Sequence, residues 1–237
     1  MMSLKKGNNV VIGDNVQLGE NIQIGNNVTI YANTVIKDNV IIMDNAVIGK
    51  YPVRAKASIL PTIDELPPCV IGTGVTIGTS AIIYANANID REVFIADLAT
   101  VRERVNIGHS TIIGRGVAIE NDCNVGSYCK LETNCYITAY SILEDNVFIA
   151  PCVVFTNDNY MGRSKERFNK FKGPHIKKGG RIGANSTILP NKIIYEDGTV
   201  AAGSLVTKDV PGKKIFMGSP AKVYKNVPLN QLLENQE

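Results

Sequence analysis

The sequence predicts an all-β fold, a coil of short parallel strands, on the basis of three observations. A large aliphatic residue recurs at every sixth position over most of the 237 residues. The chain contains 29 Ile and 23 Val against 12 Leu, and β-branched side chains favour strands. It also contains 24 Asn and 21 Gly, which tolerate tight turns and left-handed backbone. These features exclude an all-helical bundle and predict many short strands separated by frequent corners.

The six-residue repeat runs through three blocks, over residues 12–48, 71–155 and 176–206. Every sampled position in these blocks is large and apolar, and a mostly small residue follows each one four positions later. We interpret each hexad as a short strand that points two side chains inward, followed by a corner. Three hexads, or 18 residues, then make one turn of a triangular coil. Residues 18 apart within a block should therefore stack at the roughly 4.8 Å spacing of parallel strands.

The corners of the first block are rich in Asn and Asp, which suit turns because they adopt left-handed backbone readily. The pairs are Asp14-Asn15, Asn26-Asn27, Asp38-Asn39 and Asp44-Asn45. We therefore expect left-handed corner residues at these positions.

Two insertions interrupt the coil. Residues 49–69 hold four of the ten prolines (Pro52, Pro61, Pro67 and Pro68), which predicts an extended loop, either a plain spacer or a flap over a substrate site. Residues 157–175 form a basic loop with Arg163, Lys165, Arg167, Lys170 and Lys172 and a single glutamate, Glu166. This loop is either a solvated surface segment or a place where phosphates bind.

The repeat resembles that of the hexapeptide-repeat acyltransferases over residues 10–210, nearly the whole chain. The resemblance implies a left-handed parallel β-helix, although the general crossover rule favours the right hand. It divides the chain into a β-helix domain, residues 1–210, and a C-terminal extension, residues 211–237. It also implies a homotrimer with sites between neighbouring subunits, which the flat sides of a prism would allow.

Composition narrows the functional class. A net charge of +3 with 20% charged residues does not favour nucleic acid as a partner. No apolar run approaches the roughly 18 residues of a membrane span, and no signal-peptide core follows the start. Five cysteines, an odd number, indicate reduced thiols and a cytoplasmic protein. Three of them, Cys123, Cys129 and Cys135, occupy small inward positions on three sides of the coil.

Only two histidines are present, which excludes a zinc site of the three-histidine carbonic anhydrase type, so we expect no metal. His109 occupies an ordinary corner position. His175 ends the basic loop and is the better reserve candidate for a general base.

The outward second position of most hexads is Gly or Ala, and the exceptions are candidate binding residues. Steps of 18 stack Tyr84, Arg102, Glu120, Thr138 and Thr156 on one edge. The row is either a surface ladder of weak ion pairs or the lining of a polar groove.

The nearby stretch over residues 80–103 is similar to the segment with which nucleotide-linked amino-sugar N-acyltransferases hold their acceptor. That resemblance makes Ser80, Asp90 and Asp97 candidates for positioning the sugar, and we expect Asp90 or Asp97 to accept a hydrogen bond from the acceptor amine. We further expect Glu120 and Asn157 to hold sugar or nucleotide groups, and Arg163 on the basic loop to contact a diphosphate.

The C-terminal third is similar to the coenzyme A end of these enzymes, over residues 182–190, 200–211 and 218–222. Ala184 and Ala202 are 18 apart and should stack, which leaves a bare edge for a pantetheine arm. The residues Thr207, Lys208 and Lys222 complete the candidate set, and the two lysines would meet the phosphates. The alternative interpretation is that these segments form a generic cap that closes the β-helix.

The sequence therefore predicts an acetyl-coenzyme A-dependent N-acetyltransferase that acts on a dTDP- or UDP-linked amino deoxysugar. A neutral amine attacks a thioester without a protein general base, which fits the scarcity of histidine. One alternative is an O-acetyltransferase that uses His175 or His109 as the base. Another is a non-catalytic β-helix that binds a partner or serves as a scaffold.

Overall fold

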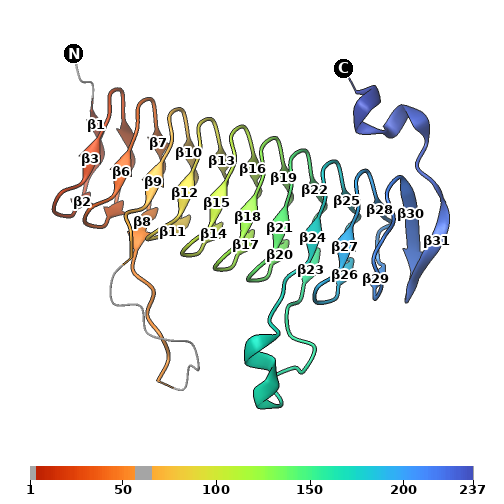
Figure 1. The fold of residues 1–237 in the computed structure, drawn as a ribbon. Helices are drawn as coiled ribbons and strands as arrows, with labels where there is room; N and C mark the ends of the chain where they lie inside the picture. The colour runs from red at the N-terminus through yellow and green to blue at the C-terminus, as the bar shows by residue number, and fades with distance from the viewer. Residues whose placement is uncertain (1–3, 57–65, 237) are drawn as a thin grey trace.

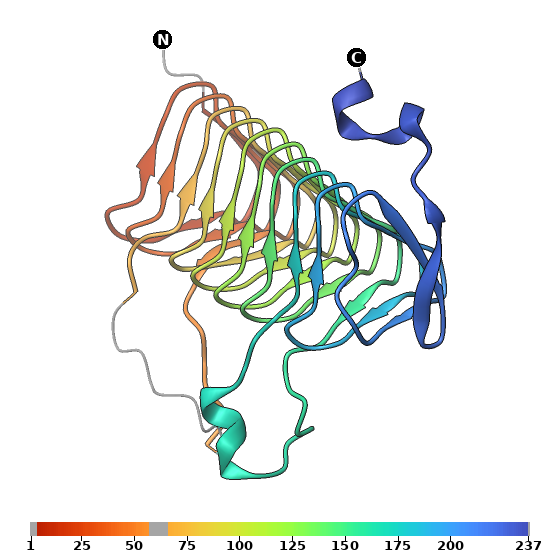
Figure 2. The ribbon, with the colours of Figure 1, turned by 45° about the vertical axis from the view of Figure 1, so that its right-hand side comes forward.

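The protein is a left-handed parallel β-helix, a straight three-sided prism from which two loops project (Figures 1 and 2). The computed structural model describes residues 4–56 and 66–236. Three parallel sheets, A, B and C, form the sides, and successive strands of the chain fall on A, B and C in turn. The predicted fold class is confirmed.

The strands are mostly two residues long. Sheet A consists of β1 (Lys5–Lys6), β4 (Gln23–Ile24), β7 (Ile41–Ile42), β10 (Thr76–Ile77), β13 (Phe94–Ile95), β16 (Ile112–Ile113), β19 (Lys130–Leu131), β22 (Phe148–Ile149), β25 (Arg181–Ile182), β28 (Thr199–Val200), β30 (Lys214–Gly218) and β31 (Ala221–Asn226). Sheet B consists of β2 (Val11–Ile12), β5 (Thr29–Ile30), β8 (Val47–Lys50), β11 (Ile82–Tyr84), β14 (Thr100–Val101), β17 (Ala118–Ile119), β20 (Tyr136–Ile137), β23 (Val154–Phe155), β26 (Thr187–Ile188) and β29 (Leu205–Val206). Sheet C consists of β3 (Gln17–Leu18), β6 (Val35–Ile36), β9 (Val70–Ile71), β12 (Asn88–Ile89), β15 (Asn106–Ile107), β18 (Asn124–Val125), β21 (Ile142–Leu143), β24 (His175–Ile176) and β27 (Ile193–Ile194).

Stacking follows the predicted 18-residue register. Thr100 of β14 pairs with Ala118 of β17, and Ala118 pairs with Tyr136 of β20. Across the two insertions the sheets continue unbroken, because β6 pairs directly with β9 and β21 pairs directly with β24. Both loops are therefore additions to a coil whose geometry they leave unchanged.

The core is the inward column of each sheet. The sixth-position aliphatic residues of the middle block are almost completely buried, and so are Cys123, Cys129 and Cys135, as predicted. Burying one such aliphatic side chain stabilises a fold by about 1.5–3 kcal/mol. The coil is thus stabilised along its whole axis by many buried side chains, each of which contributes a similar free energy.

The corners adopt left-handed backbone. The φ angles of Asn15, Asn27, Asn39 and Asn45 lie between 54° and 60°, which confirms the expectation for the first block. The same geometry recurs at Leu98, where φ is 61°. The coil therefore imposes the conformation even where the residue does not favour it.

Each prism edge can be named by the sheets that it joins: the A–B corner, the B–C corner and the C–A corner. The proline-rich loop leaves the B–C corner after β8, and the basic loop leaves the same corner after β23. Figures 1 and 2 show both loops projecting from this edge. We call it the loop corner, with corner segments 84–86, 102–104, 120–122 and 138–140 between the two loops.

The loop boundaries differ slightly from those expected. The first loop begins at residue 51, because β8 extends through Lys50, which pairs with Tyr84. Pro61 lies outside the described residues. The basic loop spans residues 157–174, since His175 already belongs to β24, and it contains the 3-10 helix η1 (Lys165–Asn169).

The C-terminal segment closes the end of the prism. Strand β30 continues sheet A beside β28, and β31 turns back antiparallel to it. The short 3-10 helices η2 (Leu229–Gln231) and η3 (Leu233–Asn235) follow, and the Leu233 N–H donates to Asp197 (3.1 Å). The division into residues 1–210 and 211–237 stays a prediction. Nowhere in residues 4–56 and 66–236 is there a helix with the length and apolarity that a bilayer crossing demands.

Candidate active site

The loop corner carries a stacked row of three interacting side chains. The guanidinium of Arg102 lies over the Tyr84 ring, with its Cζ 4.7 Å from the ring centroid. Its Nη1 also faces a carboxylate oxygen of Glu120 at 3.5 Å, one turn further along the coil. Three of the five residues in the predicted row, Tyr84, Arg102 and Glu120, are therefore in contact, with a cation held between an aromatic face and a carboxylate.

A buried carboxylate, that of Glu103, holds Arg102 of this row in place. Glu103 has no exposed side-chain surface, and it accepts hydrogen bonds from Arg102 Nε (2.9 Å) and Nη2 (3.3 Å). Arg54, from the start of the proline-rich loop, donates to the same carboxylate at 3.2 Å. Burial works to lower the pKa of Arg102, but the contacts with Glu103 outweigh it and the net pKa is raised. Sequence reasoning missed Glu103, because polar residues at this hexad position are ordinary.

A second ion pair joins the same two corner segments, 102–104 and 120–122, two residues further along each. Arg104 donates two parallel hydrogen bonds to Asp122, at 2.6 and 2.7 Å, and Asn121 donates to the same carboxylate at 2.6 Å. Burial tends to raise the pKa of Asp122, but the hydrogen bonds from Arg104 and Asn121 prevail, so its pKa lies below the usual value. Bidentate pairs of this kind hold both partners in one orientation.

At the loop corner, the middle residue of each of these four corner segments is buried. Ala85, Glu103, Asn121 and Ala139 are all buried there. The corresponding residues of the other two corners are partly or fully exposed. The loop corner is thus the edge where polar side chains are partly removed from water, which strengthens their interactions.

The basic loop is organised around one aspartate. Asp158 accepts hydrogen bonds from the backbone N–H groups of Tyr160 (2.8 Å) and Gly162 (3.0 Å) and from Arg167 (2.9 Å). Asn157 lies at the base of the loop and donates to the carbonyl of Ala139. The loop is therefore a built structure attached to the loop corner.

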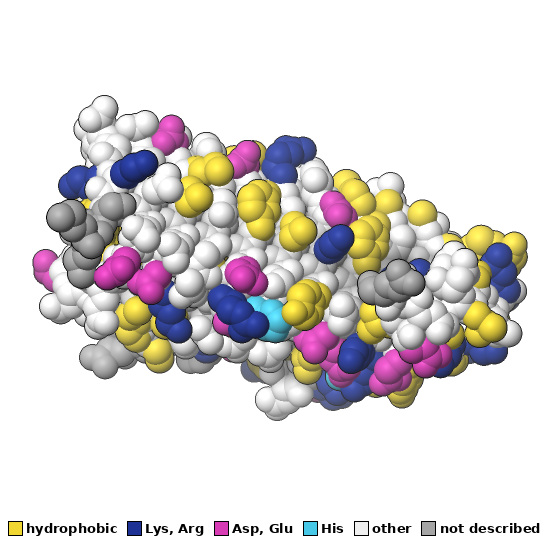
Figure 3. Space-filling model, turned by 90° about the horizontal axis from the view of Figure 1, so that it is seen from above, with side chains coloured by type: hydrophobic (Ala, Val, Ile, Leu, Met, Phe, Trp, Pro, Cys, Tyr) yellow, Lys and Arg dark blue, Asp and Glu magenta, His cyan; other side chains and the backbone are white. Residues whose placement is uncertain are grey.

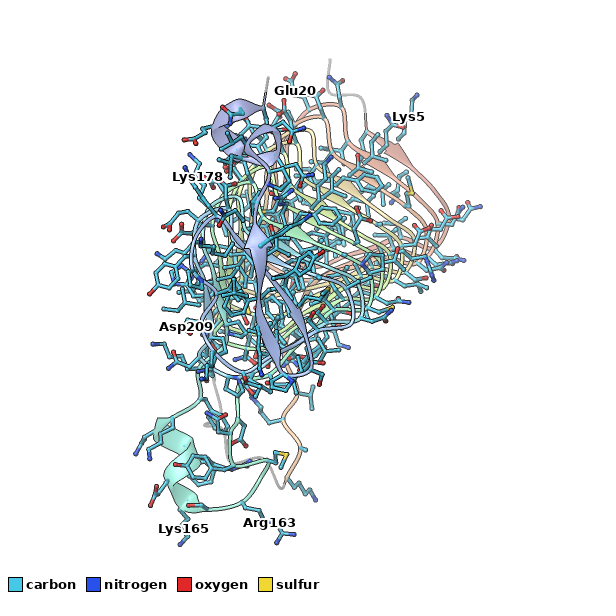
Figure 4. All side chains as sticks on the ribbon, turned by 90° about the vertical axis from the view of Figure 1, so that its right-hand side faces the viewer. Lys5, Glu20, Arg163, Lys165, Lys178 and Asp209 are labelled. Atoms are coloured by element: carbon cyan, nitrogen blue, oxygen red, sulfur yellow. The ribbon has the colours of Figure 1, made fainter. Side chains whose placement is uncertain are left out.

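Arg163 lies far from this base. Figure 4 shows Arg163 and Lys165 at the tip of the loop, pointing away from the prism. Within a single chain, Arg163 therefore does not lie at the row formed by Tyr84, Arg102 and Glu120.

The A–B corner holds a different group of candidates. Asp97 accepts a hydrogen bond from the backbone N–H of Thr79 at 2.7 Å, next to Ser80. Further along the same corner Ala184 and Ala202 stack as predicted, and the Gly203 N–H donates to the Ala184 carbonyl at 2.8 Å. A side chain added at Gly203 would meet nothing within 4 Å, so this stretch is open, bare backbone.

The two candidate lysines lie on different parts of the prism. Lys222 is the second residue of β31 in sheet A, and the hairpin beside it reaches the A–B corner, where the Gly218 N–H donates to Ser204 (3.2 Å). Thr207 and Lys208 instead follow β29 at the loop corner, in the last turn of the coil. The structure therefore groups Lys222 with Ala184 and Ala202, apart from Lys208.

Asp90 lies on the third edge, the C–A corner. Its carboxylate accepts a hydrogen bond from the N–H of Arg91 at 2.7 Å. It borders a pocket over the outer face of sheet C, where Asn106 donates to Asn124 at 2.9 Å. The three carboxylates proposed from sequence, Asp90, Asp97 and Glu120, thus lie on three different corners of one chain.

The face opposite the loops carries charges of both signs. Figure 3 views the molecule from that side, and acidic and basic side chains lie intermixed along it. His109 belongs to the C–A corner and packs edge-on against Tyr128, with the ring centroids 4.8 Å apart.

His175 lies on the outer face of sheet C. Its Nε2 is 2.9 Å from Glu144, which also accepts a hydrogen bond from Lys177 (2.8 Å). Burial works to raise the pKa of Glu144, but the contacts with Lys177, His175 and the Lys178 N–H together outweigh it and the net pKa is lowered. A histidine oriented by a carboxylate is an arrangement that general bases use.

Among the described residues, no cluster of His, Cys, Asp and Glu is arranged to hold a metal ion.

Comparison with known proteins agrees with this architecture. The model of the bacterial transferase hexapeptide (six repeats) matches residues 7–38 and 21–51. A serine acetyltransferase from Buchnera aphidicola is 28% identical over 149 residues, which cover 61% of this chain and 43% of that protein. A dTDP-3-amino-3,6-dideoxy-alpha-D-galactopyranose 3-N-acetyltransferase from Aneurinibacillus thermoaerophilus is 48% identical over 48 residues, 20% of this chain and 25% of that protein. The chain thus spans less than half the length of these curated relatives.

A solved structure extends the comparison to three dimensions. A crystal structure from Bacillus cereus, described as an acetyltransferase, superposes with a TM-score of 0.51 at 26% identity. The match covers 61% of this chain and 80% of that one. The repeat and the three-sided coil are those that the resemblance to the hexapeptide-repeat acyltransferases implies, and the similarities to acetyltransferases agree with that resemblance.

Proposed function

We propose that the protein is a coenzyme A-dependent N-acetyltransferase whose acceptor is an amino deoxysugar linked to dTDP or UDP. The observation that carries the proposal is the contacting row of Tyr84, Arg102 and Glu120 at the loop corner, on the stretch between the two loops. It offers an aromatic face, a guanidinium and a carboxylate within one short stretch. The similarity to a dTDP-amino-sugar N-acetyltransferase over 48 residues supports the same acceptor class.

Glu120 is the group that we assign to the acceptor amine. One of its carboxylate oxygens faces Arg102, and the other has no hydrogen-bond partner among the described residues. A free carboxylate oxygen accepts a hydrogen bond from an amine and orients the nitrogen lone pair. The adjacent Arg102 offsets the negative charge, so the pair stabilises an ammonium ion less than an isolated carboxylate would. The amine is thereby oriented and more of it stays neutral.

The A–B corner fits the acyl donor, acetyl-coenzyme A, which is a co-substrate. Ala184, Ala202 and Gly203 leave open backbone along which a pantetheine arm can run, and we assign Lys222, on β31, to a coenzyme phosphate. Thr207 and Lys208, in the last turn at the loop corner, are the remaining candidates for coenzyme phosphates. Polar backbone groups suit an arm whose two amides need hydrogen-bond partners.

The reaction follows from the chemistry of a thioester. The neutral amine attacks the acetyl carbonyl carbon, so a C–N bond forms and the C–S bond breaks. The electron pair of the broken bond leaves on the coenzyme A sulfur, which finally takes the proton that the amine nitrogen loses. The products are an amide and free coenzyme A thiol, and backbone N–H groups are the candidates to stabilise the intermediate oxyanion. Positioning is the main contribution of the protein.

The acceptor and donor candidates lie on two corners separated by sheet B, so we propose that the site forms between copies in a homotrimer. The A–B corner of one copy, with Asp97 and Ser80, would face the loop corner of the next. Apolar side chains on the outer face of sheet A support burial against another copy: Phe94, Ile112 and Phe148 are 43%, 40% and 36% exposed. Asp90 lies outside such a site, and its assigned role stays a prediction.

A second candidate function is an O-acetyltransferase, which the contact between His175 and Glu144 favours. A hydroxyl acceptor needs a base to remove its proton, and an imidazole held by a carboxylate could supply one. The two functions differ in the acceptor that they use.

The test is release of free thiol from acetyl-coenzyme A by the purified protein. The acceptors are dTDP- and UDP-linked 3-amino and 4-amino deoxysugars, with the matching hydroxyl sugars as controls. We expect turnover with an amino sugar alone. Turnover with hydroxyl sugars alone would contradict the base-free mechanism and favour His175, and no turnover with either acceptor would contradict the proposed function.

A further inference from the structure

Glu103 is the most deeply buried charged side chain in the described part of the chain. It stands in a column of buried corner residues whose other members, Ala85, Asn121 and Ala139, are small or neutral. A carboxylate at such a position costs free energy unless it is paired and hydrogen-bonded. Replacing buried ion pairs by packed apolar groups is often neutral or stabilising, so stability alone does not account for Glu103.

The partners of Glu103 come from two separate parts of the chain. Arg102 forms a fork with both carboxylate oxygens, at 2.9 and 3.3 Å, and Arg54 donates from the proline-rich loop at 3.2 Å. Arg104 approaches to 4.0 Å while it is bonded to Asp122. A single carboxylate therefore connects the row at the loop corner with the described start of the loop, residues 51–56.

The fork determines where the Arg102 guanidinium can lie. A planar guanidinium bound through Nε and Nη2 has its plane fixed, and Nη1 then projects toward Glu120. The same plane covers the Tyr84 ring. Without Glu103, Arg102 could rotate toward solvent, and Glu120 would lose the neighbouring positive charge.

We propose that Glu103 is a positioning residue, a buried carboxylate that aligns Arg102 between Tyr84 and Glu120 and ties the proline-rich loop to the same corner, an inference that rests on the proposed acceptor site. Glu103 does not touch the substrate in this account. It acts through Arg102 and Arg54.

The first test is Glu103→Gln, which keeps the side-chain shape and removes the charge. We expect the KM for the amino sugar to rise about tenfold or more, with the KM for acetyl-coenzyme A changed less than about twofold. The matched control is Glu20→Gln, on the exposed C–A corner (Figure 4), which should leave both constants unchanged. An unchanged acceptor KM in Glu103→Gln would overturn the proposal.

The second readout does not depend on activity, so a failure of the proposed function can be told apart from a failure of this inference. In protein labelled with 15N-arginine, the Nε–H of Arg102, assigned with Arg102→Lys, should exchange slowly with solvent. We expect Glu103→Gln to abolish that protection. Equal protection in the wild type and Glu103→Gln would overturn the inference, whichever acceptor the enzyme uses.

A third variant keeps the test decisive if Glu103→Gln does not fold. Arg54→Gln removes only the loop contact and leaves the Arg102 fork in place. We expect Arg102 Nε–H to stay protected while the acceptor KM rises, because the loop is released from the corner. An acceptor KM equal to that of the wild type would overturn the role assigned to the link between Arg54 and Glu103.

Discussion

The loop corner and the A–B corner arise from the same six-residue repeat and yet differ in what their polar residues do. At the A–B corner, Asp97 is exposed and accepts a hydrogen bond from the backbone of the preceding turn. At the loop corner, Glu103 is buried and binds two arginines, one of them 49 residues away in the chain. Polar side chains at the A–B corner therefore stabilise the backbone of the turns, whereas those at the loop corner bind one another.

This difference shows how a coil of regular repeats acquires a candidate binding site at one edge. The inward column is equally apolar under both corners, so the core does not distinguish them. The two insertions leave one edge and contribute contacts to it, since Arg54 donates to the buried Glu103 and Asn157 donates to the carbonyl of Ala139. Function on a regular coil is thus expected where irregular segments meet it.

The largest effect should come from removing the buried carboxylate. Glu103→Ala leaves the buried face of Arg102 without its partner, and breaking a buried ion pair typically costs about 3–5 kcal/mol. We expect the free energy of unfolding in urea to fall by that amount. Glu92→Ala, on the exposed C–A corner, should change it by less than about 1 kcal/mol. Equal losses in the two variants would contradict the distinction between the corners.

A smaller effect is expected at the A–B corner. Asp97→Ala removes one hydrogen bond to the Thr79 N–H, which water can replace, so stability should fall by about 1 kcal/mol. If Asp97 faces the acceptor from a neighbouring copy, the same variant raises the acceptor KM or lowers kcat without unfolding the coil. Steady-state kinetics beside thermal melting would separate the two roles. Unchanged kinetics would remove Asp97 from the site.

The ion pair between Arg104 and Asp122 should make stability depend on pH. The folded-state pKa of Asp122 is lowered, so its carboxylate stabilises the fold above the unfolded value of about 3.9. That contribution is lost as the pH falls through the lower folded pKa. We therefore expect the difference in Tm between the wild type and Asp122→Asn to be largest at neutral pH and to shrink toward pH 3.

The partner variant serves as the control for this titration. Arg104→Met removes the same ion pair from the other side and should remove the larger share of the pH-dependent part of the stability, while the hydrogen bond from Asn121 keeps the rest. A difference in Tm between the wild type and Asp122→Asn that stays constant from pH 7 to pH 3 would show that the pair contributes nothing through its charge.

The smallest effect is expected at the histidine. His175 lies on sheet C with Glu144, away from the loop-corner row, so His175→Ala should leave kcat/KM for an amino sugar within about twofold of the wild type. Activity with hydroxyl sugars, measured on the same variant, is the comparison. A loss of amine acetylation of a hundredfold or more, typical of a missing general base, would favour the alternative mechanism.

Much of this architecture was predictable because it is local and periodic. The repeat predicted the three-sided coil, the 18-residue register, the buried cysteines and the stacking of Tyr84 on Arg102 and Glu120. Each of these depends on residues at fixed spacing, which a sequence displays directly. The left hand of the coil came from resemblance to a family, since the spacing alone is the same for either hand.

Other features depend on contacts that no spacing reveals. The bond between Arg54 and Glu103 depends on the path that residues 51–56 take after β8, and no repeat spacing determines that path. The left-handed backbone of Leu98, Tyr128 and Tyr140 is imposed by the coil and cannot be read from residue preference. The separation of Lys208 from Lys222 follows from the antiparallel return of β31, which lies beyond the last repeat.

The most direct test of the account compares two glutamates on different corners. Glu120→Gln removes the charge from the loop-corner row, whereas Glu92→Gln makes the same change on the C–A corner, where Glu92 accepts a hydrogen bond from Ser110. The account predicts that Glu120→Gln raises the KM for the amino sugar or lowers kcat, with kcat/KM down by about 10- to 100-fold, and that Glu92→Gln matches the wild type. Equal kinetics in the two variants would contradict the assignment of the acceptor to the loop corner.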